Sequence, residues 1–150
     1  MNNAFGEITY TVRPDVSNEL LNELFAASWP NNSDPEVEQS QSRDFEPVLS
    51  RSLTFVCAFA GGRLVGFVYL AWDGGRHAFL LDTTVHPEFR NRGIGIELCT
   101  RVVRVAKERG LDWVHVDFES HLAEFYAKCG FQSTAAGLVR LFREDLGQGS

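Results

Sequence analysis

One continuous stretch limits the possible folds of this chain more than any other: an apolar strand, a turn, a glycine-containing loop and a long helix. The apolar run over residues 76–85 is followed by Pro87, which has no N–H group and cannot continue a strand ladder. The loop then reads Arg90-x-x-Gly93-x-Gly95. Residues 96–109 are predicted to form a helix, because apolar residues at helical spacing give it one face toward a core. That face comprises Ile94, Leu98, Val102 and Val105.

A strand followed by glycines and a helix start is typical of an anion-binding site. The first amide groups of a helix have no partner within the helix, and they carry partial positive charge. Because Gly93 and Gly95 lack side chains, a phosphate can approach the backbone closely. The loop is neither a dinucleotide fingerprint, which has a third glycine, nor a P-loop, which has Gly-Lys-Ser/Thr. A plain helix entry that binds no phosphate is the alternative.

The loop resembles the pyrophosphate-binding motif of the GNAT superfamily of N-acetyltransferases, written Gln/Arg-x-x-Gly-x-Gly/Ala. A second segment is similar to the Tyr-x-Lys-x-Gly-Phe segment of that family and follows in the family's order. Its sequence is Phe125-Tyr126-Ala127-Lys128-Cys129-Gly130-Phe131. The resemblance covers residues 63–131 and implies that acetyl-CoA enters a gap between two splayed parallel strands. Those strands are expected at residues 76–85 and 113–119.

Length and composition agree with one ordinary domain over residues 1–150, with 44% hydrophobic and 23% charged residues. No long apolar run or basic leader predicts membrane insertion or export, and a cytoplasmic location is expected. The three cysteines have no metal-ligand spacing, so no metal is expected. With 14 basic and 20 acidic residues the net charge is −6, which argues against a nucleic-acid partner.

The periodicity of the sequence predicts an α+β fold with a mixed sheet in the order β-α-α-β-β-β-α-β-α-β. A first strand at residues 8–12 precedes a helix capped by Asp15 or Ser17, and a second helix is expected from Ser33. The middle of that second helix, residues 38–44, is almost wholly polar. Downstream we expect strands at residues 54–60, 63–72, 76–85 and 113–119, a helix at 121–129, and one or two strands within 131–143.

Acyl transfer to an amine requires a neutral amine, a donor to the carbonyl oxygen and a proton for the departing thiolate. The resemblance places Tyr126 beside the thioester sulfur, where its phenol can supply that proton. A packed aromatic ring without a catalytic role is the alternative.

The general base is not carried over from the family. Some members have Glu or His six or four residues before the valine that matches Val85, and here those positions are Phe79 and Leu81. His77 shares their strand parity, whereas Asp82 has the opposite parity unless a bulge turns it. The remaining candidates on or after the partner strand are Asp117, Glu119 and His121.

The resemblance implies that acetyl-CoA contacts backbone groups of the strand end and of the helix entry. A backbone amide near Thr84 or Val85, where the family's strand carries an irregularity, is expected to stabilise the oxyanion. Arg90 and Arg92 are candidates to screen the phosphates. The predicted contacts are Thr83, Thr84, Val85, Arg90, Asn91, Arg92, Gly93, Ile94, Gly95, Tyr126 and Lys128.

The predicted function is transfer of an acetyl group from acetyl-CoA to an amine of a small molecule or protein, by direct attack in a ternary complex. The alternative is a domain of the same fold that binds or senses acyl-CoA without turnover. Acceptor specificity is expected from Trp29, the polar segment and the turn at Trp72-Asp73. A homodimer is possible, since such domains often pair.

Overall fold

The structure is a computed structural model of the 150-residue chain, and it describes residues 7–29 and 42–141. The chain is organised in two compact units, Met1–Val116 and Asp117–Ser150, and each is described by itself. The helix expected from Ser33 and most of the polar segment 38–44 lie outside the described residues. Within the described part of the chain, no helix is long and apolar enough to cross a membrane.

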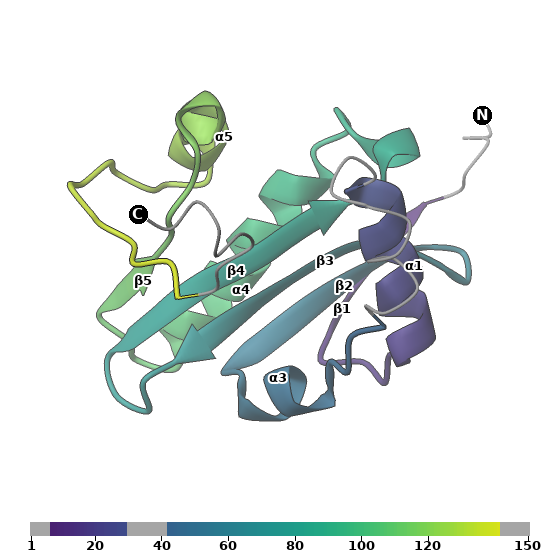
Figure 1. Cartoon of the computed structure of the whole chain (residues 1–150), viewed down its shortest axis with the longest axis horizontal. Helices are drawn as coiled ribbons and strands as arrows, with labels where there is room; N and C mark the ends of the chain where they lie inside the picture. Colours follow the sequence, from purple (N-terminus) through teal and green to yellow (C-terminus); the bar gives the residue numbers. More distant parts are fainter. Residues whose placement is uncertain (1–6, 30–41, 142–150) are drawn as a thin grey trace, which may run out of the picture. The chain divides into compact units, whose positions relative to one another are not determined.

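The first unit is built on a mixed sheet whose strands lie in the order β1-β2-β3-β4-β5 (Figure 1). The strands are β1 (Ile8–Val12), β2 (Thr54–Ala60), β3 (Arg63–Trp72), β4 (His77–Val85) and β5 (Trp113–His115). β1 to β4 pair antiparallel, and β4 pairs parallel with β5. A helical crossover joins two parallel neighbours, as the sequence predicted, so the expected α+β class is confirmed.

Helices cover both faces of this sheet. Figure 1 shows α1 (Asn18–Ser28) in front of the sheet and α4 (Ile94–Glu108) behind it. Ser17 caps α1 by accepting a hydrogen bond from the Leu20 N–H at 3.1 Å, which confirms one of the two predicted caps. A six-residue helix, α3 (Glu46–Arg51), leads into β2 and was not anticipated. The core on the α1 face includes Leu21, Leu24, Phe45, Phe55, Cys57, Leu64 and Phe67.

Gly66 of β3 marks the closest approach between the sheet and α4. A Cβ atom there would lie 3.0 Å from Leu98 Cδ1 and 3.2 Å from both Ala58 Cβ and Ile94 Cγ2. Since packed interiors resist added volume, Gly66→Ala is expected to lower the free energy of unfolding by about 1–3 kcal/mol in a denaturant titration. Gly62→Ala is the control, because a Cβ at Gly62 meets nothing within 4 Å. Equal stability of the two variants would contradict the tight packing of α4 on β3.

The second unit contains η3 (Ser120–Leu122) and α5 (Ala123–Lys128), which together replace the single helix expected over residues 121–129. Gly130 follows α5 in the left-handed region at φ 97°, as predicted for a helix-ending glycine. Residues 131–141 form neither helix nor strand, so the strands expected there are wrong for these residues. Their apolar side chains Leu138, Val139 and Leu141 are exposed, and strand propensity alone does not form a ladder without a packed neighbour.

Candidate active site

A β-bulge interrupts β4 close to its carboxyl end. Phe67 pairs with Thr84 and Tyr69 pairs with Leu81, which leaves Asp82 and Thr83 together opposite a single residue of β3. Asp82 adopts a left-handed backbone with φ 56°, a conformation that aspartate tolerates better than most residues. The irregularity that the resemblance implied for this strand is therefore present.

The bulge decides which face of the sheet carries the Asp82 carboxylate. Asp82 lies 3.7 Å from the Arg43 guanidinium and acts electrostatically on Tyr69, and both neighbours lie on the α1 face. Thr83 instead approaches Cys99 of α4, with 3.7 Å between Oγ1 and Sγ. The extra residue therefore turns the Asp82 side chain to the α1 face, which regular alternation after Leu81 would not do. This is the face that a bulge was expected to give Asp82.

Burial perturbs the acidic groups of this cluster. Desolvation raises the pKa of the Asp82 carboxyl above its ordinary value, and the Arg43 guanidinium opposes part of that rise. Desolvation also raises the pKa of the Tyr69 hydroxyl, and the neighbouring Asp82 charge adds to the effect. An aspartate with a raised pKa on a strained backbone is a frequent property of functional sites.

Arg43 and Tyr69 complete the surroundings of Asp82. Sequence reasoning included Arg43 only within the polar segment 38–44 expected to contribute to acceptor specificity, and it missed Tyr69. The Arg43 guanidinium carbon lies 4.6 Å from the Phe45 ring centroid and 5.4 Å from that of Phe25. No sequence pattern identifies this cluster, because Arg43 belongs to a polar segment far from β4 along the chain. For Tyr69, the sequence shows only that it lies in a strand rich in valine and aromatic residues, and this pattern predicts burial but no role at a site.

Beyond the bulge, one edge of β4 is left open. The parallel pairing with β5 ends at Phe79 and His115, and in the described residues no strand pairs with that edge from Leu80 to Val85. His86 donates its N–H to Val65 O at 2.8 Å on the β3 side. Because successive N–H groups of a strand alternate in direction, the Val85 N–H points away from β3 toward the open edge.

The loop after β4 is fixed at both of its ends. The buried Phe89 ring closes η2 (Pro87–Phe89), with the Arg92 guanidinium carbon 5.2 Å from its centroid. Arg90 donates from Nε to Val85 O at 3.2 Å and from a terminal nitrogen to Ser28 O at 3.1 Å. The Arg90 side chain therefore joins the end of β4 to the end of α1, and its predicted contact with the phosphates stays a prediction.

The entry to α4 has the properties that a phosphate requires. Gly93 is the N-cap residue at φ 79°, and a Cβ built there would meet nothing within 4 Å. Glu97 donates its N–H to Gly93 O at 3.0 Å, whereas the N–H groups of Ile94 and Gly95, in the first turn, have no acceptor within the helix. This arrangement of free amide groups and open space fits the pyrophosphate of CoA.

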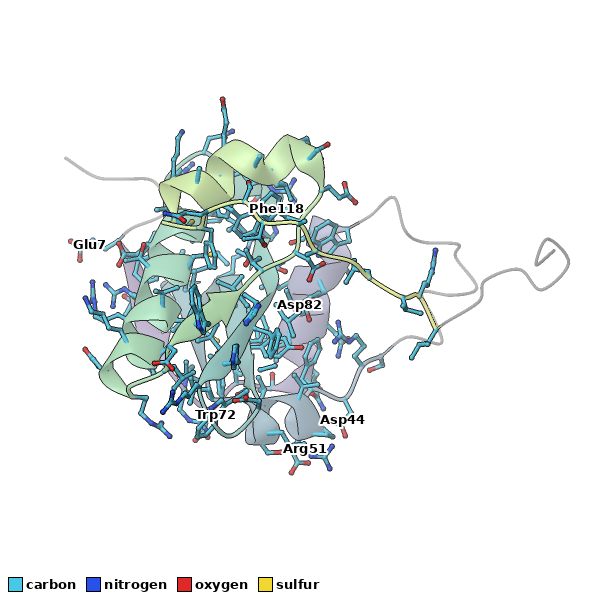
Figure 2. All side chains as sticks on the ribbon, turned by 90° about the vertical axis from the view of Figure 1, so that its left-hand side faces the viewer. Glu7, Asp44, Arg51, Trp72, Asp82 and Phe118 are labelled. Carbon is cyan, nitrogen blue, oxygen red and sulfur yellow. The ribbon has the colours of Figure 1, made fainter. Side chains whose placement is uncertain are left out.

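The other base candidate of the first unit lies far from the bulge. His77 begins β4, five residues before Asp82, and is therefore roughly 17 Å from it at the usual rise of a strand. Its Nδ1 lies 2.8 Å from His115 Nε2. Figure 2 shows Trp72 at the same lower end of the sheet, well below Asp82. The structure therefore does not bring His77 or the Trp72-Asp73 turn to the open edge. Trp29 lies nearer to it, because it directly follows Ser28, whose Oγ lies 3.5 Å from Val85 O.

The second unit holds the remaining predicted residues. Tyr126 is buried, its ring stacked on Phe118 at 4.9 Å and edge-on to Phe125 at 4.8 Å and Phe131 at 5.9 Å between centroids. Lys128 lies in the last turn of α5. Glu119 is exposed, and its Oε2 lies 3.4 Å from His121 Nδ1. Over the described residues of both units, no group of three or more His, Cys, Asp or Glu side chains is arranged to hold a metal ion.

Known proteins are similar to this chain in sequence and in fold. The model of the family described as "Acetyltransferase (GNAT) family" matches residues 18–131. The chain is 40% identical over 58 residues to "Probable glucosamine 6-phosphate N-acetyltransferase 2" of Oryza sativa, which covers 39% of this chain and 35% of the rice protein. This chain spans 31% to 55% of the length of such curated relatives.

Two solved structures extend the likeness. A GNAT family acetyltransferase from Streptococcus pneumoniae superposes with a TM-score of 0.70 at 27% identity, covering 92% of this chain and 100% of the other. An N-acetyltransferase from Thermoplasma acidophilum, solved in complex with coenzyme A, has a TM-score of 0.68 at 24% identity and covers 86% and 93%. The family match spans most of the chain, including the bulged β4, the helix entry and Tyr126. This chain belongs to the GNAT family of acetyltransferases.

Proposed function

We propose that this protein transfers an acetyl group from acetyl-CoA to a primary amine by direct attack in a ternary complex. The observation that carries the proposal is the open edge of β4 beyond its bulge, next to the amide-lined entry of α4. The edge provides backbone hydrogen-bonding groups, and the helix entry provides a site for a pyrophosphate. Both features come from one continuous segment, so a single ligand with a phosphate end and an amide-containing arm fits them.

Each chemical requirement of the reaction has a proposed group in this chain. Acetyl-CoA supplies the thioester whose carbonyl carbon forms the new bond to nitrogen as its bond to sulfur breaks. Asp82 removes the proton that the amine must lose, and the Val85 N–H donates a hydrogen bond to the carbonyl oxygen as charge develops there. Tyr126 donates its phenolic proton to the departing thiolate. The backbone groups of Thr83 and Val85 bind the pantetheine arm, whereas alternation turns the Thr84 backbone toward β3.

Relatives support acyl transfer but differ in their acceptors. Their names include an aminosugar-phosphate acetyltransferase of rice and a histone acetyltransferase of Glycine max, and the Thermoplasma acidophilum structure contains coenzyme A. A carboxylate placed by a bulge on the same face as Tyr69 favours catalysis over the alternative of a CoA sensor. A single domain, a homodimer and a cytoplasmic location remain predictions.

Binding of CoA is tested most cleanly by a matched pair of substitutions at Gly93. Asparagine and aspartate both tolerate the φ of 79° observed there, and both are good N-cap residues. Only aspartate places a negative charge beside the proposed pyrophosphate. We expect Gly93→Asp to bind CoA at least ~10-fold more weakly than Gly93→Asn in a calorimetric titration, a difference of about 1.4 kcal/mol.

The thermal unfolding of the same two variants is the control for this titration. Aspartate at a helix N-terminus interacts favourably with the helix dipole, so Gly93→Asp should be at least as stable as Gly93→Asn. A loss of CoA affinity without a loss of stability would locate the pyrophosphate at this helix entry. Equal CoA affinities for the two variants would contradict the site.

A further inference from the structure

The surroundings of Asp82 contain a positive charge that the proposed reaction does not use. Arg43 lies 3.7 Å from the Asp82 carboxylate, a distance longer than the ~2.8 Å of a direct charge-assisted hydrogen bond. The Arg43 and Asp82 side chains remain 47% and 35% exposed, so a molecule in solution can reach both charges. The guanidinium opposes the rise of the Asp82 pKa, but it repels a simple cationic amine that approaches this base.

Arg43 is held in place from two directions. Its guanidinium lies over the rings of Phe45 and Phe25, at 4.6 and 5.4 Å from their centroids. Its backbone N–H donates to Asn22 Oδ1 and its carbonyl accepts from Asn22 Nδ2, each at 3.0 Å, which joins it to α1. A guanidinium fixed in this way loses little conformational entropy when it binds an anion.

The opposite charges of Asp82 and Arg43 can therefore orient a ligand that carries both charges. The Asp82 carboxylate and the Arg43 guanidinium lie side by side on the α1 face of the sheet, at the bulge of β4. A ligand with an ammonium group and an anionic group on neighbouring atoms places each of its charges against the opposite charge of this pair. Guanidinium groups bind carboxylates and phosphates in a bidentate manner, which adds geometric selectivity to the charge preference.

We infer that the acceptor is an amine that carries its own anionic group close to the amine, as an α-amino acid or a 2-aminoethyl phosphate does. Arg43 binds that anionic group, and Asp82 receives the proton of the amine. The inference rests on the proposed function and adds a class of acceptor to it. Arg43 is thereby a specificity-determining residue, whose effect is expected in KM for the acceptor more than in kcat.

Matched acceptors and matched arginine variants test this inference. Thiol release from acetyl-CoA is measured with L-amino acids and the amides of the same amino acids, with 2-aminoethyl phosphate and ethanolamine, and with spermidine. We expect a ~10-fold or larger preference in kcat/KM for the anionic member of at least one pair, since one good ionic contact contributes about 1.4 kcal/mol. The preferred pair distinguishes a carboxylate from a phosphate.

The variants show whether Arg43 causes the preference. Arg43→Gln should abolish it mainly by raising KM for the anionic acceptor, and Arg43→Lys should retain part of it. Arg76→Gln removes the same charge from an exposed ion pair with Asp112 at the β3–β4 turn, and it should leave the preference unchanged. CoA affinity, measured in parallel, should be equal in all four proteins.

Two results would overturn the inference while leaving the proposed function intact. One is transfer to the acceptors without an anionic group, spermidine included, as fast as to the acceptors that carry one. The other is an Arg43→Gln variant that retains the full preference for the anionic member. Thiol release with none of the amines, despite binding of CoA, would instead overturn the proposed function and the inference with it.

Discussion

Replacement of Asp82 by asparagine is expected to lower kcat by a factor of ~10² to 10⁴, the usual effect of losing a general base. The amide has nearly the shape of the carboxylate but cannot accept the proton of the amine. Asparagine also tolerates the φ of 56° at this position, so the bulge and the fold should be preserved. CoA binding, measured by calorimetry, should not change, because the proposed pyrophosphate site lies at the entry of α4 and not at Asp82.

The pH dependence of the same variant gives an independent measurement. Asp82 acts as a base only when ionised, so kcat/KM should fall as the pH drops through its pKa. Since burial raises that pKa, the acid limb should lie above the ordinary range of aspartate, and Arg43→Gln should move it higher by removing the opposing guanidinium. Wild-type turnover in Asp82→Asn, or an acid limb that survives in it, would rule out this role.

The free energy of unfolding should also depend on pH through the raised pKa of Asp82. A carboxyl whose pKa is raised by folding contributes stability while it is protonated, below its ordinary pKa. That contribution is lost as the pH rises through the raised pKa of the folded state. Relative to Asp82→Asn, the wild type should therefore lose stability over this acidic window and not gain it.

Replacement of Tyr126 by phenylalanine is expected to lower kcat by a similar factor of ~10² to 10⁴, because one general acid is removed. The ring stacked on Phe118 and edge-on to Phe125 and Phe131 is retained, so the fold of the second unit should persist. Affinity for acetyl-CoA should barely change, since the proton is required only as the carbon–sulfur bond breaks. Steady-state kinetics on a good acceptor and a calorimetric titration measure the two quantities separately.

A purely structural Tyr126 would give the opposite balance. Loss of a hydroxyl that only bonds a neighbouring group would lower the free energy of unfolding by about 1 kcal/mol and leave turnover near that of the wild type. Activity measured with acceptors whose amines differ in basicity adds a control, because a missing leaving-group acid affects all of them. Normal turnover in Tyr126→Phe would mean that solvent or the acceptor protonates the thiolate.

Much of the fold could be predicted because its signals are local. The diglycine at Gly61-Gly62 joins two largely apolar runs, and the structure has a hairpin there with Gly61 at φ 61°. Gly110 follows α4 at φ 81°, as expected for a helix-ending glycine. The loop from Arg90 to Gly95 was identified for the same reason, since a phosphate-binding helix entry is encoded by residues that follow one another in the chain.

What could not be predicted depends on backbone irregularity and distant contacts. A bulge shifts which face a residue occupies without changing the pattern of residue types, so the parity of Asp82 stayed ambiguous. Arg43 meets Asp82 only after α1 and α3 have placed two phenylalanine rings beneath it. The strand expected at residues 113–119 is shorter in the structure, Trp113–His115, because alternation continues past the point where pairing with β4 ends.

The central claim is that the acetyl group passes from acetyl-CoA directly to an amine held beside Asp82. The most direct measurement is the mass-spectrometric yield of N-acetylated acceptor alongside the yield of free CoA in one reaction. The account predicts equal yields of the two products with wild-type protein, and both reduced to a small fraction in Asp82→Asn. It would be contradicted by CoA release without an N-acetylated product, or by equal product yields from Asp82→Asn and the wild type.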